Sequence, residues 1–329
     1  MMTGRTSMKC RGRGAAAAFS ALLFALSSAA AGQTPGDRPI RLVAPSAAGS
    51  GHDLSTRILA DGLAAELGQV VIVENRPGAD GILAAERVAT AAPDGTTLLS
   101  GLGSQFAINP AIYARLPYDP QRDFEPVSLI ARQTLFIAVN PTLPVSTPQE
   151  LATWSRAHPG TIDYATATNT FMLAAESFKH RTGADMMHVP YQSGAPAMNA
   201  LVSGIVEVSV ISATSAISFA KAGRIRVLAV MGPARVRDLP DVPTFAELGL
   251  PEDVPVWSAL AAPAGTPKAV VERLHAAVVR ALARPEIRER FLAGAEVPVG
   301  STSAELAATI VRDTERMKAL VKAIGLPPK

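Results

Sequence analysis

The sequence has only one cysteine among 329 residues, Cys10, and it lies in the first segment of the chain. If that segment is an export signal that is removed, no cysteine remains. Disulfide bonds, cysteine-based zinc sites and thiol catalysis are then excluded. The protein must instead rest on a hydrophobic core, which about 298 remaining residues can supply in one or two domains.

A long apolar run is also missing. The run Ala15–Leu26 is too short to span a bilayer, and no later run replaces it. Basic residues precede it (Arg5, Lys9, Arg11 and Arg13), and the small residues Ala29–Ala31 follow it. This order predicts a signal over residues 1–31 that is cleaved near Ala31. Because Cys10 precedes the apolar run, a lipid-anchored cysteine is not expected.

Acidic residues are absent from residues 1–31, so removing this segment changes the charge. The basic residues fall from 31 to 27 against 28 acidic ones, and the net charge moves from +3 to about −1. The basic character of the full chain therefore belongs to the signal, and no nucleic-acid partner is expected.

Signatures of catalysis are missing as well. Gly49-Ser50-Gly51 lacks the third glycine of a dinucleotide fingerprint, and neither a Gly-Lys-Ser/Thr phosphate loop nor a Gly-x-Ser-x-Gly elbow occurs. The histidines show no metal-ligand spacing (His52, His158, His180, His188 and His275). We expect no catalytic residue, no metal and no cofactor.

Strand-like runs alternate with helical patterns, which predicts an α/β fold with largely parallel sheets. Strands at 40–44, 70–73 and 96–99 are separated by helices that end near Gly68 and Ala91. Proline-rich irregular chain follows, from Asn109 to Pro126. Strands at 127–131 and 135–139 then carry the chain to a second domain.

The second domain is predicted from strands at 162–165, 187–190 and 206–211, with helices after them. The run Ile225–Val230 is expected to return the chain to the first domain. Helices beginning at Thr266-Pro267 and at the capping box Thr302–Glu305 complete it. The predicted domain I is 32–132 with 230–329, domain II is 133–229, and a double crossover of this kind is typical of a hinged binding protein.

Four loops of small and hydroxyl residues follow predicted strands, at 45–53, 101–105, 166–170 and 191–195. The loop Pro45–Asp53 also precedes a helix, whose N-terminus offers unpaired N–H groups and a positive dipole end. Loops of this composition at the carboxyl ends of strands favour the binding of a small polar anion. Asp53 has two compatible interpretations: a helix N-cap, or a contact to a ligand ammonium or hydroxyl group.

Taken together, several motifs resemble those of the substrate-binding proteins of tripartite tricarboxylate transporters, the Bug family. The motifs are Pro45-x-x-x-Gly49-x-Gly51-x-Asp53, Val73–Ala79, Ala92–Gly95, Ile108–Pro110, Leu116–Pro120, His188–Tyr191, Gly194–Ala197, Lys221–Gly223, Leu239–Thr244 and Ala262–Pro267. They cover essentially the whole chain after the predicted signal.

The resemblance implies a periplasmic, two-domain binding protein of type II fold with a hinged interdomain cleft. It would capture a small carboxylate (a dicarboxylate, tricarboxylate, acidic amino acid or aromatic acid) for membrane transporter subunits, as a monomer and without catalysis. The alternative is a solute sensor that partners a membrane histidine kinase.

The resemblance also implies the binding residues. The first loop would hold the ligand carboxylate through its backbone and ordered water, and the other loops would supply the remaining wall. The residues concerned are Pro45, Ser46, Ala47, Ala48, Gly49, Ser50, Gly51, His52, Asp53, Ser104, Thr166, Thr168, Asn169, Thr170, Ser193, Gly194 and Ala195.

Three departures from the family pattern fall in the predicted cleft walls. Ser46 and His52 replace an apolar or aromatic residue and a threonine. Thr166–Met172 is about two residues shorter than usual and lacks glycine. Ile211 stands where an aspartate is frequent. These departures leave the identity of the ligand open.

Overall fold

The structure is a computed structural model that describes residues 1–4, 38–250, 254 and 256–329. Pro39–Lys329 form one compact unit. The predicted signal and its cleavage position at Ala31 lie outside the described residues, apart from residues 1–4. No helix in the described part of the chain is both long and apolar enough to cross a membrane.

The first sheet has the strand order β11-β4-β10-β3-β1-β2. Its strands are β1 (Ile40–Ala44), β2 (Val71–Asn75), β3 (Thr97–Leu102), β4 (Phe124–Arg132), β10 (Trp257–Pro263) and β11 (Val297–Pro298). β1 pairs in parallel with β2 and β3, with Ile40 opposite Val71. β10 lies between β3 and β4 and is antiparallel to both.

The second sheet has the order β7-β6-β8-β5-β9. Its strands are β5 (Leu135–Val139), β6 (Asp163–Thr166), β7 (Met187–Pro190), β8 (Val208–Ser212) and β9 (Arg226–Met231). β6 is parallel to β7 and β8, whereas β5 is antiparallel to β8 and β9. Both sheets are therefore mixed, and the prediction of largely parallel sheets was wrong.

The helices are α2 (Gly51–Leu67), α3 (Ile82–Ala89), α4 (Asn109–Ile112), α5 (Pro148–Ala157), α6 (Asn169–Thr182), α7 (Gly194–Ser203), α8 (Ala213–Lys221), α9 (Lys268–Ala283), α10 (Pro285–Ala293) and α11 (Ser303–Ala323), with short turns η2 (Ala79–Gly81) and η3 (Ser104–Ile108). Local signals set several of their ends. α2 stops at Gly68, which is left-handed with φ +63°, and Thr302 and Glu305 form the predicted capping box of α11.

The return to the first sheet occurs later than predicted. β9, expected to lead back to the first domain, instead pairs with β5 along its whole length in the second sheet. The chain re-enters the first sheet as β10, which the sequence patterns did not reveal. Buried small residues in β10 (Ser258, Ala259, Ala261 and Ala262) carry no alternating pattern that would identify a strand.

Each face of the first sheet has its own core. On one face Leu42 and Leu98 pack with Leu59 of α2 and Leu274 of α9. On the other, Val43 and Leu99 pack with α3 and with the start of α11. These opposite directions of Leu42 and Val43 follow from the two-residue period of a strand.

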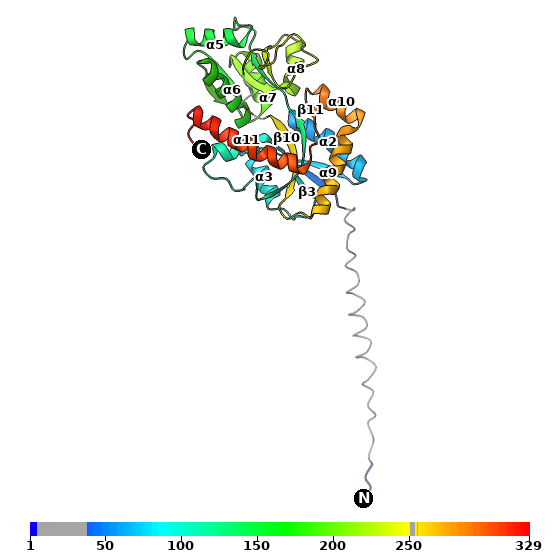
Figure 1. The fold of residues 1–329 in the computed structure, drawn as a ribbon. Helices are drawn as coiled ribbons and strands as arrows, with labels where there is room; N and C mark the ends of the chain where they lie inside the picture. The colour runs from blue at the N-terminus through cyan, green and yellow to red at the C-terminus, as the bar shows by residue number, and fades with distance from the viewer. Residues whose placement is uncertain (5–37, 251–253, 255) are drawn as a thin grey trace. The chain divides into compact units, whose positions relative to one another are not determined.

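α11 joins the cores of both sheets (Figure 1). Leu306 and Ile310, in its first half, belong to the core of the first sheet. Met317, Leu320 and Val321, in its second half, belong to a core built on β5, β8 and β9. The two sheets are thus connected by a packed helix as well as by the chain crossings at 133–134 and 232–256.

Candidate functional site

The loop Pro45–Asp53, called the clamp loop from here on, connects β1 to α2. Ser50 is the N-cap, and its side chain accepts a hydrogen bond from the N–H of Asp53. Gly49 has φ +78°, a left-handed conformation that a glycine adopts without strain. The predicted N-cap role for Asp53 was therefore wrong by three positions, because the serine hydroxyl takes that place. The N–H groups of Gly51 and His52, in the first turn, have no partner within the helix.

The carboxylate of Asp53 is bonded to donors of the protein. The side chain accepts hydrogen bonds from Gly49 N–H at 2.8 Å, from Arg57 Nε at 3.0 Å and from Asn75 Nδ2 at 2.8 Å. Burial acts to raise the pKa of Asp53, but the bonds from Arg57, Asn75 and Gly49 outweigh it and place the pKa below its ordinary value. The carboxylate thus stays charged and is occupied by donors of the protein.

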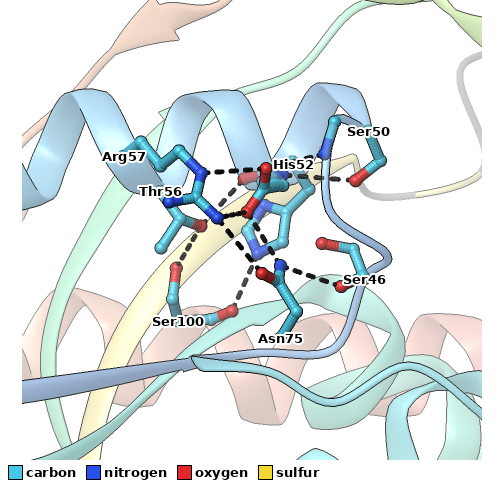
Figure 2. A network of polar contacts seen from close by, with 9 residues as sticks. Ser46, Ser50, His52, Thr56, Arg57, Asn75 and Ser100 are labelled. Atoms are coloured by element: carbon cyan, nitrogen blue, oxygen red, sulfur yellow. Dashed lines mark hydrogen bonds and ion pairs between the residues drawn. The ribbon is translucent and has the colours of Figure 1, made fainter. Parts of the chain in front are cut away.

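Asn75, at the end of β2, completes this network and was not among the predicted site residues. Its amide nitrogen also donates to the carbonyl of Ser46 at 3.1 Å, and its amide oxygen accepts from Arg57 at 3.2 Å (Figure 2). One side chain therefore ties the start of the clamp loop to its end. The signal was present in the sequence, since Asn75 lies within the motif Val73–Ala79.

His52 lies beneath the start of α2 and is 7% exposed. Its Nε2 is 2.8 Å from the carbonyl oxygen of Ser100 in β3, and since a carbonyl can only accept, Nε2 carries the proton. Burial lowers the pKa of His52, so the neutral ring is favoured. Nδ1 is then an acceptor, and it is buried without a partner among the described residues. His52 anchors the helix start to the sheet.

Ser46 shares one property with His52. Its hydroxyl is buried and has no hydrogen-bond partner within the described part of the chain. The two unusual residues of the clamp loop therefore both carry an unsatisfied polar atom, which bound water or a ligand group can satisfy.

Ser104 and Thr170 meet across the two sheets. Ser104 begins the π-helical turn η3 after β3, and Thr170 lies in the first turn of α6, with their hydroxyl oxygens 2.6 Å apart. The predicted loop 101–105 is shorter than expected, because β3 continues through Leu102. Beside this pair, Asn169 donates its N–H to Asp80 Oδ1 at 3.0 Å and accepts from Lys329 Nζ at 2.8 Å.

The other predicted residues lie at helix starts of the second sheet. Thr168 is the N-cap of α6 and accepts from the N–H of Phe171, while Thr166 shares a hydrogen bond with His188 at 2.7 Å. Ser193 is the N-cap of α7 without a side-chain bond. Gly194, with Ala195 after it, faces open space, since no atom lies within 4 Å of where its Cβ would be.

α8 supplies site residues that the predictions missed. A Cβ on Gly51 would lie 3.0 Å from Ser212 Oγ and 3.3 Å from Thr214 Cβ, so the starts of α2 and α8 lie against each other. Ser212–Ser215 is a run of small and hydroxyl residues after a predicted strand, so the rule applied to the other four loops could have found it. Ile211 is instead buried in the core with Phe136, and its predicted place in a cleft wall was wrong.

The arrangement suits the binding of an anion. The starts of α2, η3, α6, α7 and α8 follow β1, β3, β6, β7 and β8 respectively, and each offers main-chain N–H groups and hydroxyls. Contacts join the starts of α2 and α8, at Gly51 and Ser212, and those of η3 and α6, at Ser104 and Thr170. Within the described residues no cluster of histidine, cysteine, aspartate or glutamate could hold a metal ion. Polar groups of this kind fix and orient a small ligand.

Solved structures of similar proteins share the fold. The chain has a TM-score of 0.84 and 30% identity to R. palustris Rpa4515 with adipate, covering 89% of this chain and 99% of that one. It has a TM-score of 0.80 and 31% identity to MatC (Rpa3494) from Rhodopseudomonas palustris with bound malate, covering 86% and 99%. For the periplasmic binding protein BugD the values are 0.82 and 30%, covering 89% and 99%.

The sequence itself matches a family profile. Residues 55–326 match TctC, the tripartite tricarboxylate transporter family receptor, and this match extends through both sheets. The predicted resemblance and the α/β binding-protein fold are thereby confirmed. The chain belongs to the TctC family, whose members are periplasmic solute-binding proteins.

Proposed function

We propose that this protein captures a small carboxylate-bearing ligand between the clamp loop and the helix starts of the second sheet, and delivers it to a tripartite tricarboxylate-type transporter without transforming it. The observation that carries the proposal is the state of Asp53. The one carboxylate at the helix start is already bonded to three donors of the protein, so the N–H groups of Gly51 and His52 remain for an external anion. Rpa4515 with adipate and MatC with malate support a carboxylate as the ligand class.

Closure of the two sheets around the ligand is part of the proposal. The division into domain I (32–132 with 230–329) and domain II (133–229) is retained, except that β9 up to Met231 goes with the second sheet. The crossing at 133–134, between β4 and β5, would act as a hinge. Export with cleavage near Ala31, and a monomer in the periplasm, complete the proposal; mass spectrometry of the periplasmic protein tests the first, and light scattering the second.

Ligand binding is tested by thermal unfolding of the purified protein with dicarboxylates, tricarboxylates, acidic amino acids and aromatic acids. A ligand at one hundred times its Kd adds about 2.7 kcal/mol to the free energy of unfolding and raises the Tm. At least one carboxylate should do so. If no member of the panel raises the Tm, the ligand class is wrong, and if a product accumulates, the non-catalytic role is wrong.

Closure is tested by the substitution Gly51→Ala. The added Cβ would meet Ser212 Oγ at 3.0 Å, so α8 must move before the two sides can meet. We expect ligand affinity to fall about tenfold, roughly 1.4 kcal/mol. The double variant Gly51→Ala with Ser212→Ala, which removes the obstructing oxygen, should recover part of that loss. Equal losses in the single and double variants would contradict closure at this contact.

A sensor that partners a membrane histidine kinase is the second candidate function. Both functions use the same ligand site. They differ in the membrane partner that recognises the closed form. Pull-down with the ligand-saturated protein distinguishes them: capture of transporter membrane subunits supports delivery, and capture of a kinase ectodomain supports sensing.

A further inference from the structure

A cavity lies away from the clamp loop, where the chain crosses between the two sheets. It has a volume of about 160 Å³ and is lined by the second half of α6, by α11 and by ends of strands β4, β5, β9 and β10. Thr170, at the contact between the sheets, precedes Phe178 in this cavity by two turns of α6, roughly 12 Å. This cavity is therefore a separate site.

The mouth of the cavity is rich in positive charge. Four arginines line it (Arg132, Arg181, Arg312 and Arg316), together with a single acidic residue, Asp313. We call this cavity the arginine pocket. Asp313 is 2% exposed and accepts from Trp257 Nε1 at 2.8 Å and from Arg312 Nε at 3.2 Å, with Arg316 within 3.7 Å. Asp313 therefore pairs with Arg312 and Arg316, and not with Arg132.

Arg132 is the arginine that is open to a ligand. It stands at the end of β4 and is exposed, and it has no hydrogen-bond or ion-pair partner among the described residues. A guanidinium group presents a planar fork of donors that matches a carboxylate. The mouth of the pocket thus offers a binding group for an anion.

The base of the pocket is apolar and aromatic. Phe178 and Phe245 lie with ring centroids 6.2 Å apart, and Trp257 is 3% exposed with its Nε1 already bonded to Asp313. Leu135 and Met231 add aliphatic surface. An apolar cavity of about 150 Å³ accommodates a benzene ring, so a pocket with a volume of about 160 Å³ has room for one aromatic ring.

We propose that the arginine pocket binds a small aromatic monocarboxylate, with the ring against Phe178, Phe245 and Trp257 and the carboxylate at Arg132. Polyanions fit less well, because desolvation of a second charge against the aromatic surface is costly. Residues from both sheets line the pocket, so an occupant would also hold the crossing segments together. The proposal does not depend on the identity of the ligand at the clamp loop.

Benzoate is the probe, and Trp257 is the reporter. The chain has two tryptophans, and Trp154 lies on α5 stacked on His158, so the variant Trp154→Phe leaves Trp257 as the only strong emitter. Benzoate should change its fluorescence saturably, whereas benzamide, which is the same shape without the charge, should not. Arg132→Gln should weaken benzoate binding at least tenfold, since a charge-assisted hydrogen bond is lost.

Matched variants assign the binding to this pocket. Arg288→Gln removes an exposed arginine of α10, far from the pocket lining, and should leave benzoate affinity unchanged. If Arg132→Gln does not fold, Arg132→Met takes its place with the same expected loss. No saturable change with benzoate, or an affinity in Arg132→Gln equal to that of the parent protein, would each overturn the proposal.

Discussion

The clamp loop and the helix starts of the second sheet differ in where their side chains find partners. Asp53, Arg57 and Asn75 all belong to the first sheet and its helix, so the network that shapes the clamp loop is complete without the other side. Thr170 and Asn169 instead bond across to Ser104, Asp80 and Lys329. One wall is therefore organised within its own side, whereas the other has partners on the opposite side. Under the proposed closure, the second wall would be completed only when the two sides meet.

This difference suits a division of tasks. A wall with fixed backbone N–H groups can hold any carboxylate without reorganisation, which keeps the entropic cost of binding low. A wall whose hydroxyls acquire partners only on closure can discriminate by whether the ligand permits that closure. Gly194, which faces open space, leaves room for ligands of different length on that side.

The largest expected effect comes from breaking the organised wall. Asp53→Ala would leave the N–H of Gly49 and the side chains of Arg57 and Asn75 without their shared acceptor. We expect the free energy of unfolding to fall by about 4 kcal/mol, because three bonds to a buried charge are lost. Urea unfolding without ligand measures this directly. A loss below about 1 kcal/mol would show that the clamp loop does not depend on the network.

Glu296 lies at another contact between the two sides, and it allows a test of how stability depends on pH. Its carboxylate accepts from Ser55 of α2 at 2.7 Å, from Gln133 at the crossing at 3.3 Å and from Thr214 of α8 at 3.4 Å. Its Oε2 has no partner among the described residues. Burial raises the pKa of Glu296 from 4.5 to about 7, against the lowering effect of these bonds.

Because the folded protein holds this proton more tightly than the unfolded chain, Glu296 makes stability fall as pH rises from 4.5 to about 7 and changes nothing further above that range. The loss should be about 3 kcal/mol in total. Glu296→Gln should remove this slope when unfolding is followed by denaturant across pH 4.5–8. A slope that persists in the variant would assign the pH dependence to other groups.

The smallest expected effect is at the wall completed by closure. Thr170→Val removes the hydroxyl 2.6 Å from Ser104 and keeps the shape of the side chain. Ligand affinity should fall about fivefold, roughly 1 kcal/mol for one hydrogen bond, with little change in the unfolding of the ligand-free protein. Titration calorimetry and urea unfolding together test this. A large loss of stability without ligand would mean that the two walls are not organised differently.

The sequence could predict features whose residues lie close together in the chain, but not features that depend on residues far apart. The end of α2 at Gly68, the N-cap of α5 at Thr147 and the capping box at Thr302 were predictable, because the residues that form them lie within one turn of each other. The pairing of β9 with the second sheet and the existence of β10 were not predictable, because strand pairing over 87 to 139 residues leaves no local pattern.

The site shows the same limit. Helix starts after strands could be predicted from small and hydroxyl residues, and this gave the clamp loop, Ser104 and Thr170. The motif Val73–Ala79 marked Asn75, but its role could not be predicted, because its partners Ser46 and Asp53 are 29 and 22 residues away in the chain. The place of Ile211 could not be predicted either, because it depends on the direction of its side chain. Its position along β8 turns that side chain into the core.

A structure of the complex with a carboxylate that raises the Tm tests the central claim most directly. We predict that a ligand carboxylate has an oxygen about 2.9 Å from the main-chain nitrogen of Gly51 or His52. Asp53 should keep its bonds to Gly49, Arg57 and Asn75. A carboxylate bound elsewhere, with the N–H groups of Gly51 and His52 facing only solvent, would contradict it.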